Sequence, residues 1–323
     1  MAEIIQRWIV NRDQTAILEI YKLNIEELPE LPSNLQKIHC YNCPNLKKLP
    51  KLPKSLKILS CTSCPIKELP ELPESLQTLS CIGCSDLKEL PKLPKSLLHL
   101  NCYNCPIESL QELPESLQKI YYYGCPIKGI LKLPSSLQLL HCNSCPNLKE
   151  LPELPKSLTI LECHSCPIKE LPELPESLQI LRCFDSYIKE IPILPESLQS
   201  LFCNNCPIKK LPKLPPNLQD LKCYSCPIKE LPELPESLQT LCCWYCDNLK
   251  KLPELPTLLT RLSCKNCPIK KLPELPESLQ TLICYSCDNL KNLSELPVSL
   301  KYLSCKNCPI ESVPPILPKD FYL

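Results

Sequence analysis

One motif of about 20 residues, close to L-Q-x-L-x-C-x-x-C-P-I-K-E-L-P-E-L-P-E-S, repeats from Leu35 to the C-terminus of this 323-residue chain. The first cysteine of each copy falls at Cys40, Cys61, Cys81, Cys102, Cys142, Cys163, Cys183, Cys203, Cys223, Cys243, Cys264, Cys284 and Cys305. Tyr122 takes that position in one further copy, and a degenerate copy around Leu18 precedes them all, which gives about fifteen repeats. A repeat of this length predicts a solenoid, because one unit cannot bury its own apolar residues and must stack on its neighbours.

Each unit combines a short strand with an extended return segment. The stretch x-L-x-C-x alternates inward and outward residues, which predicts a strand, and equivalent strands of successive units should stack in parallel. The return segment L-P-E-L-P-E-S is unsuited to a helix because proline lacks an N–H group, so we expect polyproline II there. The predicted fold class is a horseshoe-shaped solenoid with a parallel β-sheet on its concave face and extended segments on its convex face.

Some units have 21 residues, and the extra residue always follows the second cysteine of the pair. The affected units read PNL, SDL or DNL in place of PI, after Cys43, Cys84, Cys145, Cys246 and Cys287. An insertion confined to one place marks a loop, because a loop absorbs a residue without shifting the inward-facing set.

The ends of the array require caps, because a terminal unit would otherwise expose its core. Residues 1–14 predict a short N-terminal helical cap, with Ile4, Ile5, Trp8 and Ile9 on one face. Residues 15–314 form the repeats as a single solenoid domain, and residues 315–323 form a short C-terminal tail with Leu317, Phe321, Tyr322 and Leu323 as its lid. So small a lid leaves two oligomeric states open, a monomer and a weak end-to-end dimer.

Composition restricts the function classes. The chain has 39 prolines and 3 glycines, and its 36 basic and 35 acidic residues give a formal net charge of +1. Without a basic excess, nucleic acid and anionic membrane are unfavourable partners. The N-terminus lacks the uninterrupted apolar stretch of a secretion signal, and no run is long enough to span a bilayer. We therefore expect a cytoplasmic, reducing compartment.

The pattern L-x-x-L-x-C-x-x-C-x-I-x-x-L-P resembles the leucine-rich repeat over residues 15 to about 314. The Leu-Pro-x-Leu-Pro return and the 20-residue length are similar to the short-repeat class of bacterial LPX-type effector proteins, and similar arrays occur in large DNA viruses and in amoebae. Cysteine stands at the position where asparagine is usual. The ubiquitin-ligase domain that follows the repeats in some effectors has no counterpart before Leu323, so the resemblance implies no enzymatic role. It does imply a possible location in a host cytoplasm.

The paired cysteines admit two interpretations. Two neighbouring pairs have the spacing of a zinc ribbon, as in Cys61-x-x-Cys64 and Cys81-x-x-Cys84, but any array of this repeat creates that spacing. Tyr122 and Ser186 interrupt the series, and the total of 27 cysteines is odd. We therefore interpret the cysteines as small buried residues, the second of each pair donating its S–H to the loop backbone, and expect no cofactor. Metal binding or redox response is the alternative.

Recognition should lie on the outward face of the strands, where most aromatic residues fall. The predicted partner-binding residues on this concave face are Tyr41, Tyr103, Tyr121, Tyr123, His141, His164, Phe184, Phe202, Tyr224, Trp244, Tyr245 and Tyr285. Tyrosine and tryptophan commonly anchor protein interfaces, although aromatic residues also suit strands for structural reasons. Two irregular copies, at Tyr121–Tyr123 and at Phe184–Tyr187, suggest that the centre of binding lies from the first of them to Trp244.

Catalysis is not expected. No nucleophile, base and orienting group occur at a defined spacing, and the four histidines lie on separate repeats. The favoured function is a non-catalytic protein-interaction scaffold with a protein partner. A metal or redox protein and an array without a dedicated ligand are the alternatives.

Overall fold

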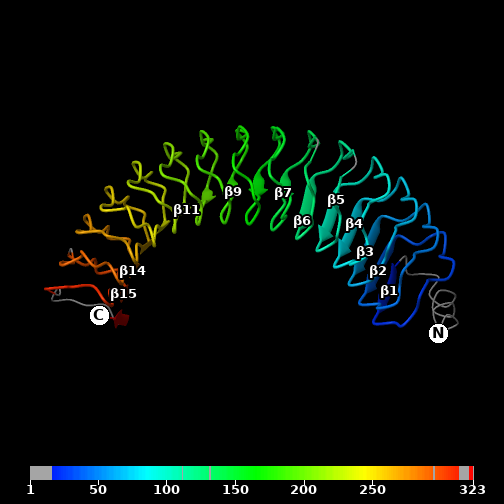
Figure 1. Ribbon diagram of the computed structural model, residues 1–323, viewed down its shortest axis with the longest axis horizontal. Coiled ribbons are helices and arrows are strands. Elements are labelled where there is room, and N and C mark those ends of the chain that lie inside the picture. The colour runs from blue at the N-terminus through cyan, green and yellow to red at the C-terminus, as the bar shows by residue number, and fades with distance from the viewer. Residues whose placement is uncertain (1–16, 111, 131, 294, 313–319, 323) are drawn as a thin grey trace. The chain divides into compact units, whose positions relative to one another are not determined.

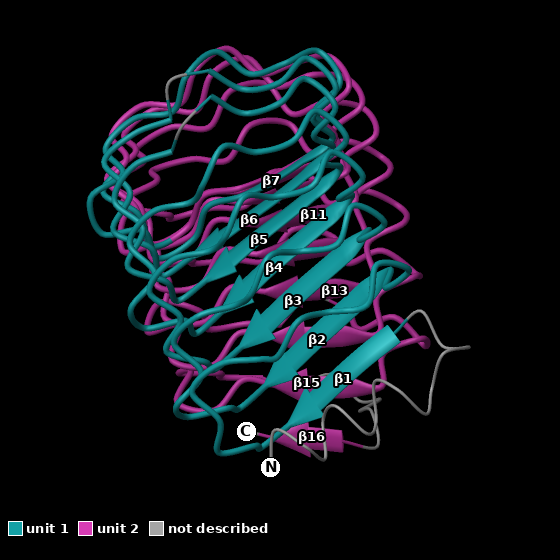
Figure 2. Cartoon of the chain, turned by 90° about the vertical axis from the view of Figure 1, so that its right-hand side faces the viewer, with its two compact units in different colours: residues 1–158, 165–167 teal, residues 159–164, 168–323 magenta. Residues whose placement is uncertain are grey.

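The computed structural model describes residues 17–110, 112–130, 132–293, 295–312 and 320–322. The chain forms two compact units, one consisting of Met1–Leu158 with Ser165–Pro167 and the other of Thr159–His164 with Ile168–Leu323. Figure 2 colours the first unit teal and the second magenta. The expected single domain over residues 15–314 stays a prediction.

In the first unit the described strands run in chain order, and each pairs in parallel with the next. They are β1 (Ile17–Tyr21), β2 (Lys37–Tyr41), β3 (Ile58–Thr62), β4 (Thr78–Ile82), β5 (His99–Tyr103), β6 (Lys119–Tyr123) and β7 (Leu139–His141). Figure 1 shows successive turns of this unit beside one another.

The second unit repeats the arrangement with shorter strands, again parallel and in chain order. They are β8 (Ile160–Glu162), β9 (Ile180–Arg182), β10 (Ser200–Phe202), β11 (Asp220–Lys222), β12 (Thr240–Cys242), β13 (Arg261–Ser263), β14 (Thr281–Ile283), β15 (Tyr302–Ser304) and β16 (Asp320–Tyr322). The backbone ladder continues past the short strands, because the Cys183 N–H donates to the Phe202 carbonyl at 2.9 Å.

The core of each unit consists of the inward-facing leucines and cysteines. In the register between β3 and β4, Leu59 lies opposite Leu79 and Cys61 opposite Cys81, and all four are fully buried. Burial of such side chains removes apolar surface from water at about 25 cal/mol per Å². The predicted parallel β-solenoid of about fifteen turns is confirmed.

Each of these turns leaves its strand through one residue in the left-handed region, directly before the position of the second cysteine, which Leu23 and Ser186 occupy in two turns. The residues with positive φ are Lys22, Asn42, Ser63, Gly83, Asn104, Gly124, Ser144, Ser165, Asp185, Asn205, Ser225, Tyr245, Asn266, Ser286 and Asn307. Most are asparagine, serine, aspartate or glycine, which are common in turns. Asparagine, aspartate and glycine also tolerate a positive φ better than other residues do. The N–H of Asn42 donates to the Thr62 carbonyl of the next turn at 2.8 Å, so the bend also joins the turns.

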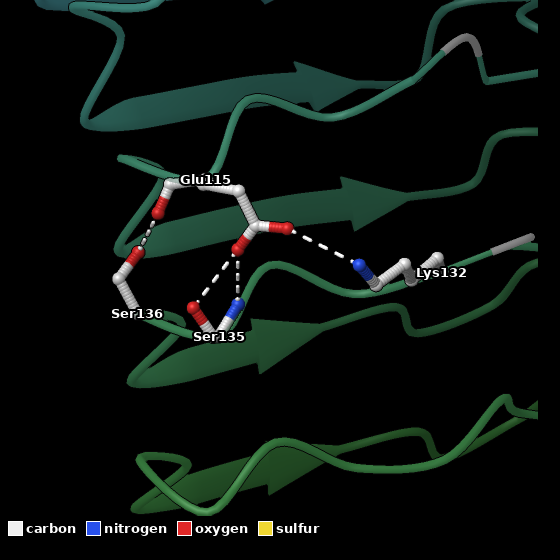
Figure 3. A network of polar contacts seen from close by, with 4 residues as sticks. All are labelled: Glu115, Lys132, Ser135 and Ser136. Carbon is white, nitrogen blue, oxygen red and sulfur yellow. Dashed lines mark hydrogen bonds and ion pairs between the residues drawn. The ribbon is translucent and has the colours of Figure 1, made fainter.

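The return segments have no regular secondary structure in the described residues, and serine fixes their ends. The Ser75 hydroxyl donates to the carbonyls of Lys54 at 2.7 Å and Leu56 at 2.6 Å in the preceding turn. In Figure 3 the Glu115 carboxylate accepts hydrogen bonds from both the N–H and the hydroxyl of Ser135 at 2.9 Å, and pairs with Lys132 at 3.4 Å. These bonds to Ser135, together with Lys132, lower the pKa of Glu115.

The predicted caps are only partly within the described residues. Residues 1–14 and 315–319 lie outside them, so the N-terminal helix stays a prediction, and the described ranges contain no helix. At the other end, Asp320–Tyr322 was expected to belong to a lid and instead forms β16, which pairs with β15. The unpaired N–H and C=O groups of an edge strand explain why a segment without the repeat motif adds to the sheet.

Candidate interaction surface

The exposed face of the sheet carries the first, third and fifth residues of each x-L-x-C-x segment. In β5 these are His99, Asn101 and Tyr103, which are partly or fully exposed, while Leu100 and Cys102 between them are buried. We call the side chains at these outward positions, together with the residue that follows the fifth position, the sheet face. The face results from strand geometry, since successive side chains point to opposite sides.

In the first unit, rings on neighbouring strands stack along the sheet face. Tyr103 and Tyr123 lie with ring centroids 4.3 Å apart and planes within 4°. Tyr21 and Tyr41 stack at 5.1 Å, and Tyr121 meets the His141 ring at 5.7 Å in a tilted arrangement. Parallel register produces these pairs, because equivalent positions on adjacent strands are about 4.8 Å apart.

In the second unit, the rings contact both other rings and cations. His164 stacks on Phe184 at 4.1 Å, and Tyr224 stacks on Trp244 at 4.1 Å. The Lys265 ammonium lies 3.7 Å from the centroid of Trp244 and 5.1 Å from that of Tyr285, so it links the two rings. A cation over an aromatic face is attracted by the ring quadrupole.

Phe202 and Tyr245 complete this part of the surface. The Phe202 ring lies between the ammonium of Lys222 at 4.2 Å and the guanidinium of Arg182 at 5.2 Å. Tyr245 is 48% exposed and meets the Trp244 ring at 5.6 Å, although its φ of 55° lies in the left-handed region.

The structure places every predicted binding residue on this side of the sheet, partly or fully exposed. It brings together Tyr103 with Tyr123, Tyr121 with His141, His164 with Phe184, and Tyr224 with Trp244 and Tyr245. Tyr41 contacts Tyr21, and Tyr285 joins Trp244 only through Lys265. Whether these residues bind a partner stays a prediction.

Sequence reasoning missed several members of the sheet face. It overlooked the cations Arg182, Lys222 and Lys265, although the repeat register places them in the same columns as the aromatic residues. It also set Tyr322 apart from the face, whereas Tyr322 in β16 lies 5.7 Å from Tyr302. That misplacement arose because the tail lacks the cysteine motif that marks the register elsewhere.

Comparison with known proteins gives matches only among solved structures, since no protein-family model and no curated protein matches the sequence. YopM from Yersinia pestis, described as a leucine-rich effector protein, is 29% identical, with a TM-score of 0.83 over 98% of this chain and 92% of that one. YopM from Yersinia enterocolitica is 33% identical, with a TM-score of 0.81 over 85% of this chain.

The repeats have the fold of leucine-rich repeats. The parallel solenoid, the 20-residue spacing and the similarity to both YopM structures agree on this fold. The match spans about 60% of the length of the Yersinia enterocolitica protein. The functional domain of InlJ from Listeria monocytogenes, which includes a cysteine ladder, is 23% identical, with a TM-score of 0.62 over 85% of this chain and 68% of that one, and supports the fold.

In these repeats, the second cysteine of most pairs links one turn to the preceding turn. The Cys105 thiol donates to the Cys81 carbonyl at 3.1 Å, and Cys267 donates to the Cys243 carbonyl at 3.1 Å. All 27 cysteines are free thiols, and nearly all are buried. The predicted backbone-capping role of the second cysteine is therefore confirmed.

Thiol chemistry is disfavoured where burial raises the pKa of a thiol. Burial raises the pKa of Cys64 and Cys125 to about 11, which keeps them protonated at neutral pH. A thiolate is the form that binds metals and reacts with oxidants. At Cys64 and Cys125 the raised pKa therefore favours the structural interpretation of the thiol.

Two leucine-rich repeats depart from the cysteine pattern in different ways. Ser186 replaces a second cysteine, and its hydroxyl donates to the Cys183 carbonyl at 2.8 Å, so the substitution preserves a backbone bond. Tyr122 replaces a first cysteine and is fully buried, and its hydroxyl has no hydrogen-bond partner among the described residues. Burial raises the pKa of Tyr122 well above its usual value.

Proposed function

We propose that this leucine-rich repeat protein is a non-catalytic scaffold that binds a protein partner through its sheet face. The observation that carries the proposal is a pair of ring-and-cation groups on the sheet face of the second unit. Phe202 lies between two cations in one group, and Trp244 contacts Tyr224 and Lys265 in the other. Rings held by stacking lose little conformational freedom on binding, which is why tyrosine and tryptophan are effective anchors. The leucine-rich effector YopM supports a role in host interaction.

The proposal includes the finer expectations drawn from the sequence. We propose that the sheet lines the concave side of a horseshoe, that the protein acts as a monomer or a weak end-to-end dimer, and that it works in a reducing cytoplasm, which is the host's for an effector. Among the described residues there is no helix with the length and apolarity that crossing a bilayer requires.

Affinity purification of the full chain followed by mass spectrometry tests the proposal. The variant Phe202→Ala with Trp244→Ala removes two rings from the sheet face, and the control Tyr187→Ala removes a ring that is 62% exposed but follows the loop position of Ser186. We expect a reproducible protein partner that the double variant loses and the control retains. Equal recovery of the partner by all three chains would contradict the proposal.

A further inference from the structure

The sheet face around β12 combines a short side chain with an unbalanced set of charges. Cys242 is half-buried and is the third residue of β12, with Lys222 and Ser263 at the equivalent positions of β11 and β13. Lys222, Arg261 and Lys265 lie close enough to this thiol to lower its pKa, against the larger opposing effect of burial, and Asp220 opposes them. Three cations and one carboxylate therefore lie near Cys242.

These cations are available for a partner. Among the described residues, Lys222, Arg261 and Lys265 form no ion pair; the ion pair on this unit's sheet face joins Arg182 to Glu162. Asp220 accepts a hydrogen bond from the Ser200 hydroxyl, which directs it toward β10 and away from Arg261 on β13. The charge of the three cations is therefore neutralised only in small part within the unit.

The neighbouring rings hold two of the cations in place. Lys265 contacts Trp244, and Lys222 contacts Phe202 at 4.2 Å. Cys242 is half-buried and Ser263 is buried, so the more exposed Arg261 and the partly exposed Lys222 and Lys265 form the outer surface here. Ordered cations beside rings suit a ligand that carries both carboxylates and apolar groups.

We propose that the partner presents an acidic segment of polypeptide whose carboxylates lie over Cys242 and Ser263, between Lys222, Arg261 and Lys265. Apolar side chains of the same segment pack beside Trp244 and the rings that flank it. This inference rests on the proposed function and adds the chemical class of the partner. Opposite charges across an interface mainly increase the association rate and exclude partners of the wrong charge.

A protein carboxylate fits this surface better than a nucleic-acid backbone. Asp185 and Asp220 lie on the same face of the second unit, and the net charge of the whole chain is only +1. A phosphate backbone requires a long series of cations because its charges repeat along its whole length, whereas a few carboxylates match three cations.

Selection of a random-peptide display library against the full chain tests the inference. We expect enrichment of peptides rich in aspartate and glutamate with aromatic or aliphatic residues between them. The variant Arg261→Glu with Lys265→Glu should weaken binding of an enriched peptide by tenfold or more, about 1.4 kcal/mol. The control Lys250→Glu with Lys251→Glu makes the same charge change at exposed positions after the second cysteine and should bind normally.

A second variant in the same binding experiment preserves the positive charge while changing the side chain. Lys265→Arg keeps the cation over Trp244 and should retain most of the binding, and an unchanged urea midpoint for each variant shows that the fold is intact. Enrichment without an acidic bias, no enrichment, or equal binding by the Arg261→Glu, Lys265→Glu variant would each overturn the inference. Tighter binding of single-stranded RNA than of acidic peptides would do the same.

The two proposals fail in different ways. If a natural partner is lost on Trp244→Ala but retained by the Arg261→Glu, Lys265→Glu variant, the scaffold function stands and the acidic partner is wrong. If the partner is unaffected by either change, the sheet face is not the binding surface and both proposals are wrong.

Discussion

At the residue scale, one backbone position in each turn selects the residue types found there. The position before the second cysteine has a positive φ throughout the described turns, and short polar residues or glycine occupy most copies. Tyr245 is a bulky exception with a φ of 55°. Strain of this kind is often retained at functional sites, and Tyr245 lies beside Trp244 on the proposed binding surface.

Replacing Tyr245 with asparagine should therefore stabilise the fold. Asparagine tolerates the left-handed region, so we expect unfolding to cost about 1 kcal/mol more, seen as a higher urea midpoint. The reverse change Asn266→Tyr, at the same position of the next turn, should lower the midpoint by a similar amount. A lower midpoint for Tyr245→Asn would show that its ring contact outweighs the strain.

Tyr122 offers a second residue-scale test, because its buried hydroxyl lacks a partner among the described residues. Tyr122→Phe removes the desolvated hydroxyl and keeps the ring, so stability should hold or rise by about 1 kcal/mol. Tyr122→Cys restores the repeat pattern but empties space, and should cost about 2–4 kcal/mol. Urea unfolding of both variants decides the matter, and a clear loss in Tyr122→Phe would reveal a partner for the hydroxyl.

At the element scale, most return segments end in a serine that bonds the preceding turn. Ser75→Ala removes the donor to two carbonyls of the preceding turn, and we expect a loss of about 1–2 kcal/mol in the free energy of unfolding. Ser85→Ala is the matched control, because that exposed hydroxyl donates only to the side chain of its neighbour Asp86, at 3.3 Å, among the described residues. Thermal unfolding should separate the two, and equal melting temperatures would assign the serine no structural role.

Elements also show what the sequence could and could not predict. The strands and the inward position of the cysteines were predictable from the alternation of apolar and polar residues. A strand shifted by one residue would expose every leucine. The positive φ at Asn42 and its equivalents was not predicted, although asparagine, serine and glycine recur at that position, because these residue types also occur in turns without a positive φ. The contact of Lys265 with two rings could not be read from residue types, since it depends on which way a long side chain turns. The strand β16 has no repeat pattern to reveal it.

At the scale of the whole molecule, the buried thiols make stability sensitive to alkaline pH. Burial raises the pKa of Cys64, Cys125 and Cys305 to about 11, above the usual value of 9.0. The unfolded chain then loses thiol protons at lower pH than the folded chain does, so folding is stabilised below about pH 9 and this stabilisation is lost as pH rises through about 11.

We therefore expect the urea midpoint to fall steeply above about pH 9. A variant Cys64→Ala should have a lower midpoint at neutral pH but a shallower alkaline decline, because one raised pKa is removed. Measurement of the midpoint in a reducing buffer from neutral pH to about pH 11 tests this. A flat profile would contradict the burial of the thiols in solution.

The bonds that join neighbouring turns, from bend N–H, cysteine thiol and serine hydroxyl, use the same positions in nearly every copy. Duplication of one turn would consequently supply its own donors and meet acceptors already in place, so the gene can lengthen or shorten by whole repeats without redesigning a core. Outward residues take no part in this fit. Selection can therefore change the binding specificity of the outward residues and the number of repeats independently of each other.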